Sequence, residues 1–218
     1  MNNGLAILGG SFDPIHLGHV KTALDIQKIF HFKKIIFMPC GQAVFKNQLH
    51  VSDADRLAML KIALHDSPQF MMDTREMMRQ GPSYTILSLE ELRTEYGKQV
   101  SLTWILGEDA FQEFENWYRY QDILSFAHLI ILARPKLKKN FSKSLDAFVE
   151  KHLTDNPEDL IQAPQGKIYF YHASNYPISS SEIREDIHNQ ILPHGLAPEV
   201  LEYIQEHACY QTQLKTNY

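Results

Sequence analysis

The chain has 218 residues, of which 44% are hydrophobic and 22% are charged, and its formal net charge is -5 at pH 7. This composition is typical of a globular protein with a sizeable core, and the acidic balance disfavours general nucleic-acid binding, which usually needs a basic surface. Cys40 and Cys209 form neither a CxxC motif nor a disulfide framework, so we expect a reducing, cytoplasmic setting, and neither a signal peptide nor a membrane span is expected.

Six short apolar segments are predicted to be strands. They are residues 5–9, 34–39, 70–73, 100–107, 128–133 and 167–171. Helical apolar spacing and capping residues predict helices between them, and Ser83 is the expected N-cap of one. These helices are residues 17–30, 53–65, 83–96 and two segments that begin near Ser180 and Pro198. Alternating strands and helices predict an α/β fold, with a doubly wound, mainly parallel sheet in a single domain over residues 1–218. Residues 136–165 have the least regular pattern, so an irregular surface excursion is expected there.

The segment GGSFDPIHLGH, residues 9–19, follows the first predicted strand. Ligands of parallel sheets bind beyond the carboxyl ends of the strands, and a following helix presents N–H groups that suit a phosphate. His16 and His19 are three residues apart and can share one helix face. Two imidazoles that donate to one phosphate would stabilise the charge that develops in a transition state.

Simpler roles are open to the two histidines, which could cap the helix, pack against it or bind a metal. A metal site is disfavoured because the HxxH spacing lacks the HExxH frame and no third ligand lies nearby in sequence. The segment also lacks the GxxxxGK[ST] pattern of a Walker loop and the GxGxxG pattern of dinucleotide-binding domains.

The same segment resembles the GG[ST]FDPxHxGH signature of the nicotinate-nucleotide adenylyltransferases. These enzymes belong to the nucleotidylyltransferase superfamily, whose hallmark is HxGH. Four further segments resemble later motifs of the family, in the family order. They are GPSYT (81–85), LGEDAFQEFENWYRY (106–120), ARP (133–135) and ISSSEIR (178–184).

The resemblance implies a Rossmann-like nucleotidylyltransferase fold and a reaction in NAD biosynthesis. The adenylyl group of ATP would pass to nicotinate mononucleotide, giving nicotinate adenine dinucleotide and pyrophosphate. Mg²⁺ would be bound mainly through the ATP phosphates, with few or no protein ligands. No nucleic-acid or membrane partner is expected, and the protein would be a monomer or a small homo-oligomer.

The resemblance also implies roles for individual residues. His16 and His19 would be catalytic and contact the ATP phosphates. The other ATP-binding residues would be Gly9, Ser11, Phe12, Gly18, Lys46, Gly107, Asp109, Ser179, Ser180, Ser181 and Arg184. The residues that bind nicotinate mononucleotide would be Ser83, Tyr84, Thr85, Trp117, Tyr118 and Arg134. Trp117 would stack on the pyridine ring, and Arg134 would bind the mononucleotide phosphate.

Several of these residues have an ordinary structural alternative. Phe12 and Trp117 could be core residues, Asp109 could be an N-cap, and the serines of ISSSEIR could simply cap a helix. Asp13 and Pro14 are interpreted as structural, because Asp-Pro favours a turn.

One segment departs from the family pattern. Relatives carry a proline-rich loop that ends in a Pro-Pro-His-Lys type of sequence, whereas residues 39–48 are PCGQAVFKNQ and only Lys46 matches. The conformation of this loop is therefore open. Two other functions stay open as well. An adenylyltransferase for phosphopantetheine would have no need of GPSYT and the Trp-Tyr pair, and the intact HxGH argues against a catalytically silent nucleotide sensor.

Overall fold

The computed structural model describes residues 4–42, 49–133, 141–172 and 176–211. Its sheet contains six strands, all paired in parallel, in the order β3-β2-β1-β4-β5-β6. They are β1 (Leu5–Gly10), β2 (Lys34–Pro39), β3 (Phe70–Met72), β4 (Leu102–Gly107), β5 (His128–Ala133) and β6 (Ile168–His172). The predicted doubly wound α/β fold is confirmed, and every strand ends within two residues of its predicted bounds.

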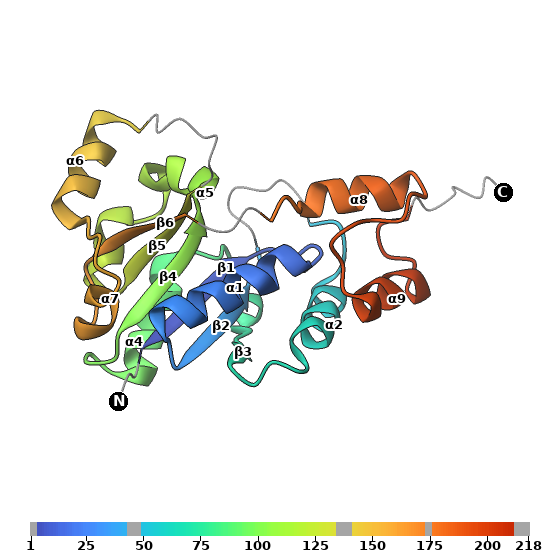
Figure 1. The fold of residues 1–218 in the computed structure, drawn as a ribbon, viewed down its shortest axis with the longest axis horizontal. Coiled ribbons are helices and arrows are strands. Elements are labelled where there is room, and N and C mark those ends of the chain that lie inside the picture. Colours follow the sequence, from blue (N-terminus) through green and yellow to red (C-terminus); the bar gives the residue numbers. More distant parts are fainter. Residues whose placement is uncertain (1–3, 43–48, 134–140, 173–175, 212–218) are drawn as a thin grey trace.

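Helices follow the strands, as the alternating pattern predicts (Figure 1). They are α1 (Leu17–Phe30), α2 (Asp53–Leu64), α3 (Arg75–Met78), α4 (Thr85–Tyr96), α5 (Glu108–Gln112), α6 (Lys143–His152), α7 (Asp159–Gln162), α8 (Ser180–His188) and α9 (Pro198–Glu206), with short 3-10 turns at Phe114–Asn116 and Tyr120–Ser125. In the part of the chain that the structure describes, no helix is long and apolar enough to cross a membrane.

Two helices form where the sequence pattern predicted irregular structure, within residues 136–165. The side chain of Ser142 caps α6 by accepting a hydrogen bond from the Leu145 N–H at 3.0 Å. Leu145 and Val149 are buried on one face of α6, and Leu160 of α7 is fully buried. The prediction of irregular structure was therefore wrong for α6 and α7, because these few buried apolar residues are enough to hold two short helices against the core.

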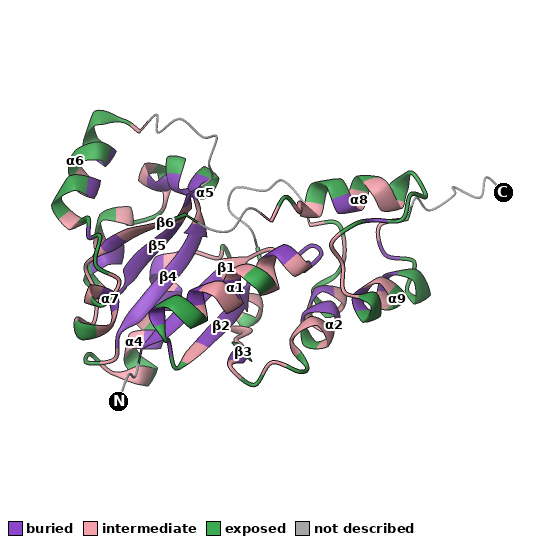
Figure 2. Ribbon diagram, in the orientation of Figure 1, coloured by how far each residue is buried: buried purple, intermediate pink, exposed green. Residues whose placement is uncertain are grey.

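Alternate side chains of each strand enter two separate cores, one on each face of the sheet. Leu5 and Ile7 of β1 pack with residues of α4, α5 and α6, whereas Ala6 and Leu8 pack with residues of α1, α2 and α9. Most strand residues are consequently buried, and exposed residues lie on the outer helix faces (Figure 2). Helices α8 and α9 lie beside α2 at one end of the molecule (Figure 1).

The strand order changes direction between β1 and β4. In open parallel sheets, the crevice beyond the carboxyl ends of the strands at such a switch point is the usual ligand site. Gly9 and Gly10 end β1 and Gly107 ends β4, so the fold places the glycine-rich segment at this crevice.

Candidate active site

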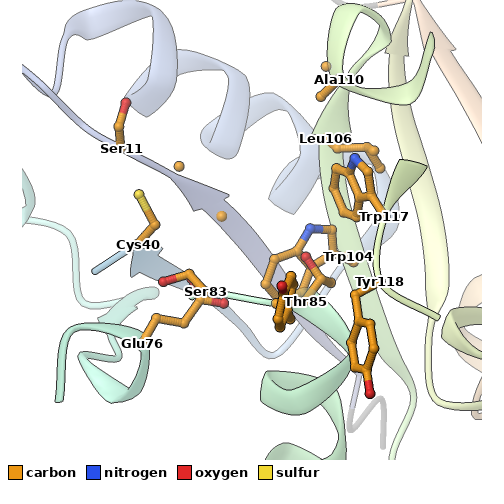
Figure 3. A pocket seen from close by; sticks show the side chains of 14 residues that line it. Ser11, Cys40, Glu76, Ser83, Thr85, Trp104, Leu106, Ala110, Trp117 and Tyr118 are labelled. Carbon is orange, nitrogen blue, oxygen red and sulfur yellow. The ribbon is translucent and has the colours of Figure 1, made fainter. Parts of the chain in front are cut away.

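A cavity of about 270 Å³ lies at the carboxyl ends of β1 and β4. Its lining combines residues that were predicted to bind a substrate with others that were given no binding role. The predicted ones are Gly9, Ser11, Ser83, Tyr84, Thr85, Gly107, Trp117 and Tyr118; the others are Gly10, Cys40, Glu76, Trp104, Leu106 and Ala110. Figure 3 shows aromatic rings on one side of this pocket and small polar side chains on the other. The pocket therefore suits a flat ring that carries a polar group.

The glycine at position 9 is required by close packing inside this pocket. A Cβ atom on Gly9 would lie 2.6 Å from Cζ2 of Trp104, which no real contact allows. The backbone of β1 thus rests directly on the Trp104 ring, and the pocket floor depends on this contact.

His16 and His19 form a stacked pair at the start of α1. His16 is the N-cap and His19 the third helical residue, and their ring centroids are 3.7 Å apart. The backbone N–H of His16 donates to Nδ1 of His19 at 3.3 Å. In a neutral His19 ring the proton is therefore on Nε2, which is the nitrogen that can donate to a ligand.

His16 is neutral at pH 7. Burial lowers its pKa to about 4, since its side chain is desolvated in the folded protein. Its Nδ1 atom is buried and has no hydrogen-bond partner in the described structure. A Cβ atom on Gly18 would lie 2.9 Å from that Nδ1, so Gly18 makes room for the His16 ring itself.

The start of α8 lies directly against the loop that carries the histidines. Ser180 donates through Oγ to the carbonyl of Pro14 at 3.0 Å, and Nη1 of Arg184 donates to the carbonyl of Asp13 at 2.6 Å. Ser179 is the N-cap and accepts from the N–H of Ser181 at 3.2 Å. The capping alternative thus holds for Ser179, while Ser180 and Arg184 join the two motifs across more than 160 residues of sequence.

Asp13 is more than a turn residue. Its buried carboxylate accepts from the backbone N–H of His50 at 2.9 Å, from the His50 ring at 3.0 Å and from the Tyr210 hydroxyl at 2.8 Å. Burial favours the neutral acid, but the donors from His50 and Tyr210 outweigh it and hold the pKa of Asp13 below its usual value. His50 and Tyr210 were missed in the sequence, because neither belongs to a motif near Asp13.

Arg56 is a second residue that the sequence did not single out. Its side chain is fully buried and donates to the carbonyls of Ser11 and Cys40, both at 2.7 Å, and to Asp53 at 2.6 Å. It therefore ties together the loops that follow β1 and β2. The only available signal was a charged residue among the apolar positions of α2.

Helix α4 begins at one wall of the pocket, but its cap differs from the prediction. Tyr84, not Ser83, is the N-cap, and it provides no side-chain cap. Ser83 instead accepts from the backbone N–H of Gly41 at 3.0 Å, because the residues that follow β2 lie beside it. This bond fixes the start of α4 against the residue after β2.

A buried carboxyl group lies next to this helix start. Glu76 lines the pocket and accepts from the hydroxyl of Ser88 at 2.7 Å. Burial raises its pKa above the usual value. A group that resists ionisation is compatible with an anionic ligand nearby.

Aromatic residues form the opposite wall. The Trp117 ring is half-buried and packs on Phe114 with centroids 5.4 Å apart, so it is part of the core edge as well as of the pocket. Tyr118 is half exposed and packs on Tyr84 at 4.7 Å. Both rings therefore line the pocket, and each packs against another aromatic ring.

The remaining predicted site residues lie around this centre. Gly107 is the N-cap of α5, so the N-cap alternative for Asp109 was wrong, and Asp109 is exposed in the first turn. Phe12 is almost fully buried and stands edge-on to His19 at 5.2 Å, which makes it a core residue that supports the histidine. Lys46 and Arg134 lie outside the described residues.

Within residues 4–42, 49–133, 141–172 and 176–211, no three His, Cys, Asp or Glu side chains are grouped to hold a metal ion. The buried Asp13 carboxylate is occupied by donors from the protein. Asp13 is therefore already paired by donors from the protein and is not placed as a metal ligand.

Comparisons with known proteins agree with this geometry. A family model described as cytidylyltransferase-like matches residues 7–186. A relative from Marinomonas sp. (strain MWYL1) is 39% identical over 96% of this chain and 95% of its own, and one from Pectobacterium atrosepticum is 37% identical over 94% and 98%. Both are named as probable nicotinate-nucleotide adenylyltransferases.

Two solved structures share the fold. The Plasmodium falciparum nicotinic acid mononucleotide adenylyltransferase complexed with NaAD has a TM-score of 0.73 at 19% identity and covers 95% of this chain and 97% of its own. A Vibrio parahaemolyticus structure, named as a putative nicotinate-nucleotide adenylyltransferase, has a TM-score of 0.63 at 16% identity, with 95% of both chains covered.

Proposed function

The chain belongs to the nicotinate-nucleotide adenylyltransferases of the cytidylyltransferase-like family, and we propose that it transfers the adenylyl group of ATP to nicotinate mononucleotide. The products are nicotinate adenine dinucleotide and pyrophosphate, in NAD biosynthesis. One observation carries this function: the stacked His16–His19 pair and the aromatic pocket lie at the same switch point of the sheet. Residues 1–218 act as one nucleotidylyltransferase domain.

The reaction is an in-line displacement at phosphorus. A phosphate oxygen of nicotinate mononucleotide forms a bond to the α-phosphorus of ATP. The bond from that phosphorus to the bridging oxygen of the β-phosphate breaks, and the electron pair leaves with pyrophosphate. No protein nucleophile is needed, because positioning and charge stabilisation drive such transfers.

The histidines and α8 supply the charge stabilisation. In its neutral form His19 carries its proton on Nε2, and the imidazole of His16 lies stacked beside it. Arg184, held at the start of α8, brings a permanent positive charge to the same loop. Donors that are already in place before the reaction stabilise charge as it develops on the phosphates. Lys46 is assigned to the ATP phosphates and Arg134 to the mononucleotide phosphate.

Mg²⁺ is the metal that we propose, bound mainly through the ATP phosphates. Described residues include no three-ligand acidic group, which is compatible with such binding. When it is bound, the ion supplies neutralisation of phosphate charge. The protein acts as a monomer or small homo-oligomer, and its cysteine pattern supports the cytoplasm as the place of reaction.

The acid form of the pyridine nucleotide is preferred, because the ring would meet the start of α4. The first N–H groups of a helix lack partners inside it and carry a partial positive charge. A carboxylate accepts from all of them, whereas a carboxamide would turn its NH₂ group toward some. Each unpaired buried group costs roughly 1–3 kcal/mol, or about 5- to 150-fold in specificity.

The test is pyrophosphate release with ATP and Mg²⁺ and each of three acceptors: nicotinate mononucleotide, nicotinamide mononucleotide and phosphopantetheine. We expect activity with the first and at least a fivefold smaller kcat/KM with the second. No release with any acceptor would refute the function, and equal kcat/KM for acid and amide would refute the role of α4.

Trp117→Ala should raise KM for the acid and the amide by the same factor, since the ring stacks on both. Phe148→Ala is the matched control. Phe148 also packs on Phe114, with centroids 6.1 Å apart, and does not line the pocket. It should lower the melting temperature and leave KM unchanged.

A further inference from the structure

The loop that carries the catalytic histidines is held from the far end of the chain. Between β1 and α1, Asp13 accepts from the Tyr210 hydroxyl at 2.8 Å, Pro14 accepts from Ser180, and the N–H of Leu17 donates to the carbonyl of Gly195 at 2.8 Å. All three anchors come from residues 180–210. We propose that Tyr210 is a positioning residue for adenylyl transfer, which acts through Asp13 to hold His16 and His19 in their reactive arrangement.

The geometry gives Tyr210 one well-defined task. Its ring packs against the core on the α1 side of the sheet, so the hydroxyl is carried by a fixed base. The residue before it, Cys209, is buried, and the N–H of Cys209 donates to the carbonyl of Ile204 at 3.0 Å. The hydroxyl therefore reaches Asp13 from an anchored segment.

The bond to Asp13 is of a strong kind. A hydroxyl that donates to a buried carboxylate forms a charge-assisted hydrogen bond, and Asp13 is only 3% exposed. His50 supplies the other two donors to the same carboxylate. Without the Tyr210 hydroxyl, one Asp13 oxygen loses its only described protein donor and the side chain must turn toward another.

Such a turn would be passed to the histidines over a short distance in the chain. Asp13 is three residues before His16, and its own carbonyl is held by Arg184 at 2.6 Å. The backbone N–H of His16 in turn donates to Nδ1 of His19 and so helps to orient the His19 ring. A small rotation of this loop therefore moves both imidazoles, and misplacement of reacting groups by about 1 Å can lower turnover about 100-fold.

The test compares Tyr210→Phe with Tyr203→Phe. Tyr203 is also a half-buried tyrosine of the C-terminal region, and its hydroxyl donates at 3.0 Å to the carboxylate of Asp55, which belongs to α2 and not to the loop between β1 and α1. Both substitutions remove one hydroxyl–carboxylate bond, and Tyr210→Phe should lower the melting temperature more, because Asp13 is buried and Asp55 is only partly buried. We expect Tyr210→Phe to lower kcat about 10- to 100-fold with KM for nicotinate mononucleotide unchanged, and Tyr203→Phe to leave kcat unchanged.

A double-mutant cycle tests whether Tyr210 acts through Asp13. If it does, Tyr210→Phe should lower kcat much less in an Asp13→Asn background than in the wild-type protein. Independent effects in the two backgrounds would overturn the proposed route.

A second readout needs no substrate and so separates this inference from the proposed function on which it rests. The ring proton resonances of His16 and His19, measured by NMR in the free protein, should shift in Tyr210→Phe and stay in place in Tyr203→Phe. Unchanged histidine resonances together with unchanged kcat in Tyr210→Phe would overturn the inference, whatever reaction the wild-type protein catalyses. If the wild-type protein is inactive but the histidine resonances shift in Tyr210→Phe, the proposed function is refuted and the positioning role of Tyr210 is retained.

Discussion

Acid should destabilise the wild-type protein through His16, and His16→Asn should remove that part of the destabilisation. The folded protein holds the pKa of His16 at about 4, whereas the unfolded chain titrates near 6.5. As pH falls from above 7, the unfolded chain therefore gains a proton first. The contribution of His16 to the free energy of unfolding must therefore decrease between pH 7 and pH 4 and stay level above pH 7.

The magnitude follows from the two pKa values. One pKa unit corresponds to about 1.4 kcal/mol, so a pKa lowered from 6.5 to about 4 amounts to roughly 3 kcal/mol of stability lost on acidification. Asparagine is a good N-cap and does not titrate, so it replaces His16 at the start of α1 without loss of the cap.

Urea unfolding at pH 7, 6, 5 and 4 measures the effect in both proteins. His128 is also buried with a pKa lowered to about 4, and it contributes equally to wild type and variant. The wild type should thus lose roughly 3 kcal/mol more than His16→Asn between pH 7 and pH 4. Parallel stability curves would show that His16 is not buried as a neutral ring, and an NMR titration of His16 above pH 5 would show the same.

Three further substitutions test the site. His19→Ala should reduce kcat about 10²–10³-fold with little change in melting temperature, because a half-buried donor is lost from a helix start, and a folded variant with most of its turnover would contradict the role. Arg184→Ala should raise KM for ATP or lower kcat; if circular dichroism shows an intact fold and both constants stay at the wild-type values, Arg184 only holds the carbonyl of Asp13. Gly9→Ala should raise KM for nicotinate mononucleotide more than KM for ATP, since the new Cβ must displace the Trp104 ring; equal changes in the two KM values would place the strain elsewhere.

The sequence alone was sufficient for the sheet and for the centre of the site. Strands such as β1 and β5 are continuous apolar runs, and α1 repeats its apolar residues at helical spacing. These strands and this helix can therefore be predicted from residues that are close together in the sequence. Two histidines one turn apart at the start of a helix can share a face, and the structure stacks their rings. Parallel strands then bring Gly9 and Gly107 to one edge of the sheet.

The tertiary structure decided which polar groups meet across long stretches of chain. Serine is a favoured N-cap residue, yet the Ser83 hydroxyl accepts instead from the backbone N–H of Gly41, 42 residues away. Arg56 is a charged residue of the type usually exposed on a helix, yet it is fully buried and bonded to the loops after β1 and β2. Tyr210 meets Asp13 across 197 residues. Hydrogen bonds of this kind depend on where the helices pack on the sheet. Local periodicity and capping patterns cannot predict that packing, because the donor and the acceptor lie far apart in the sequence.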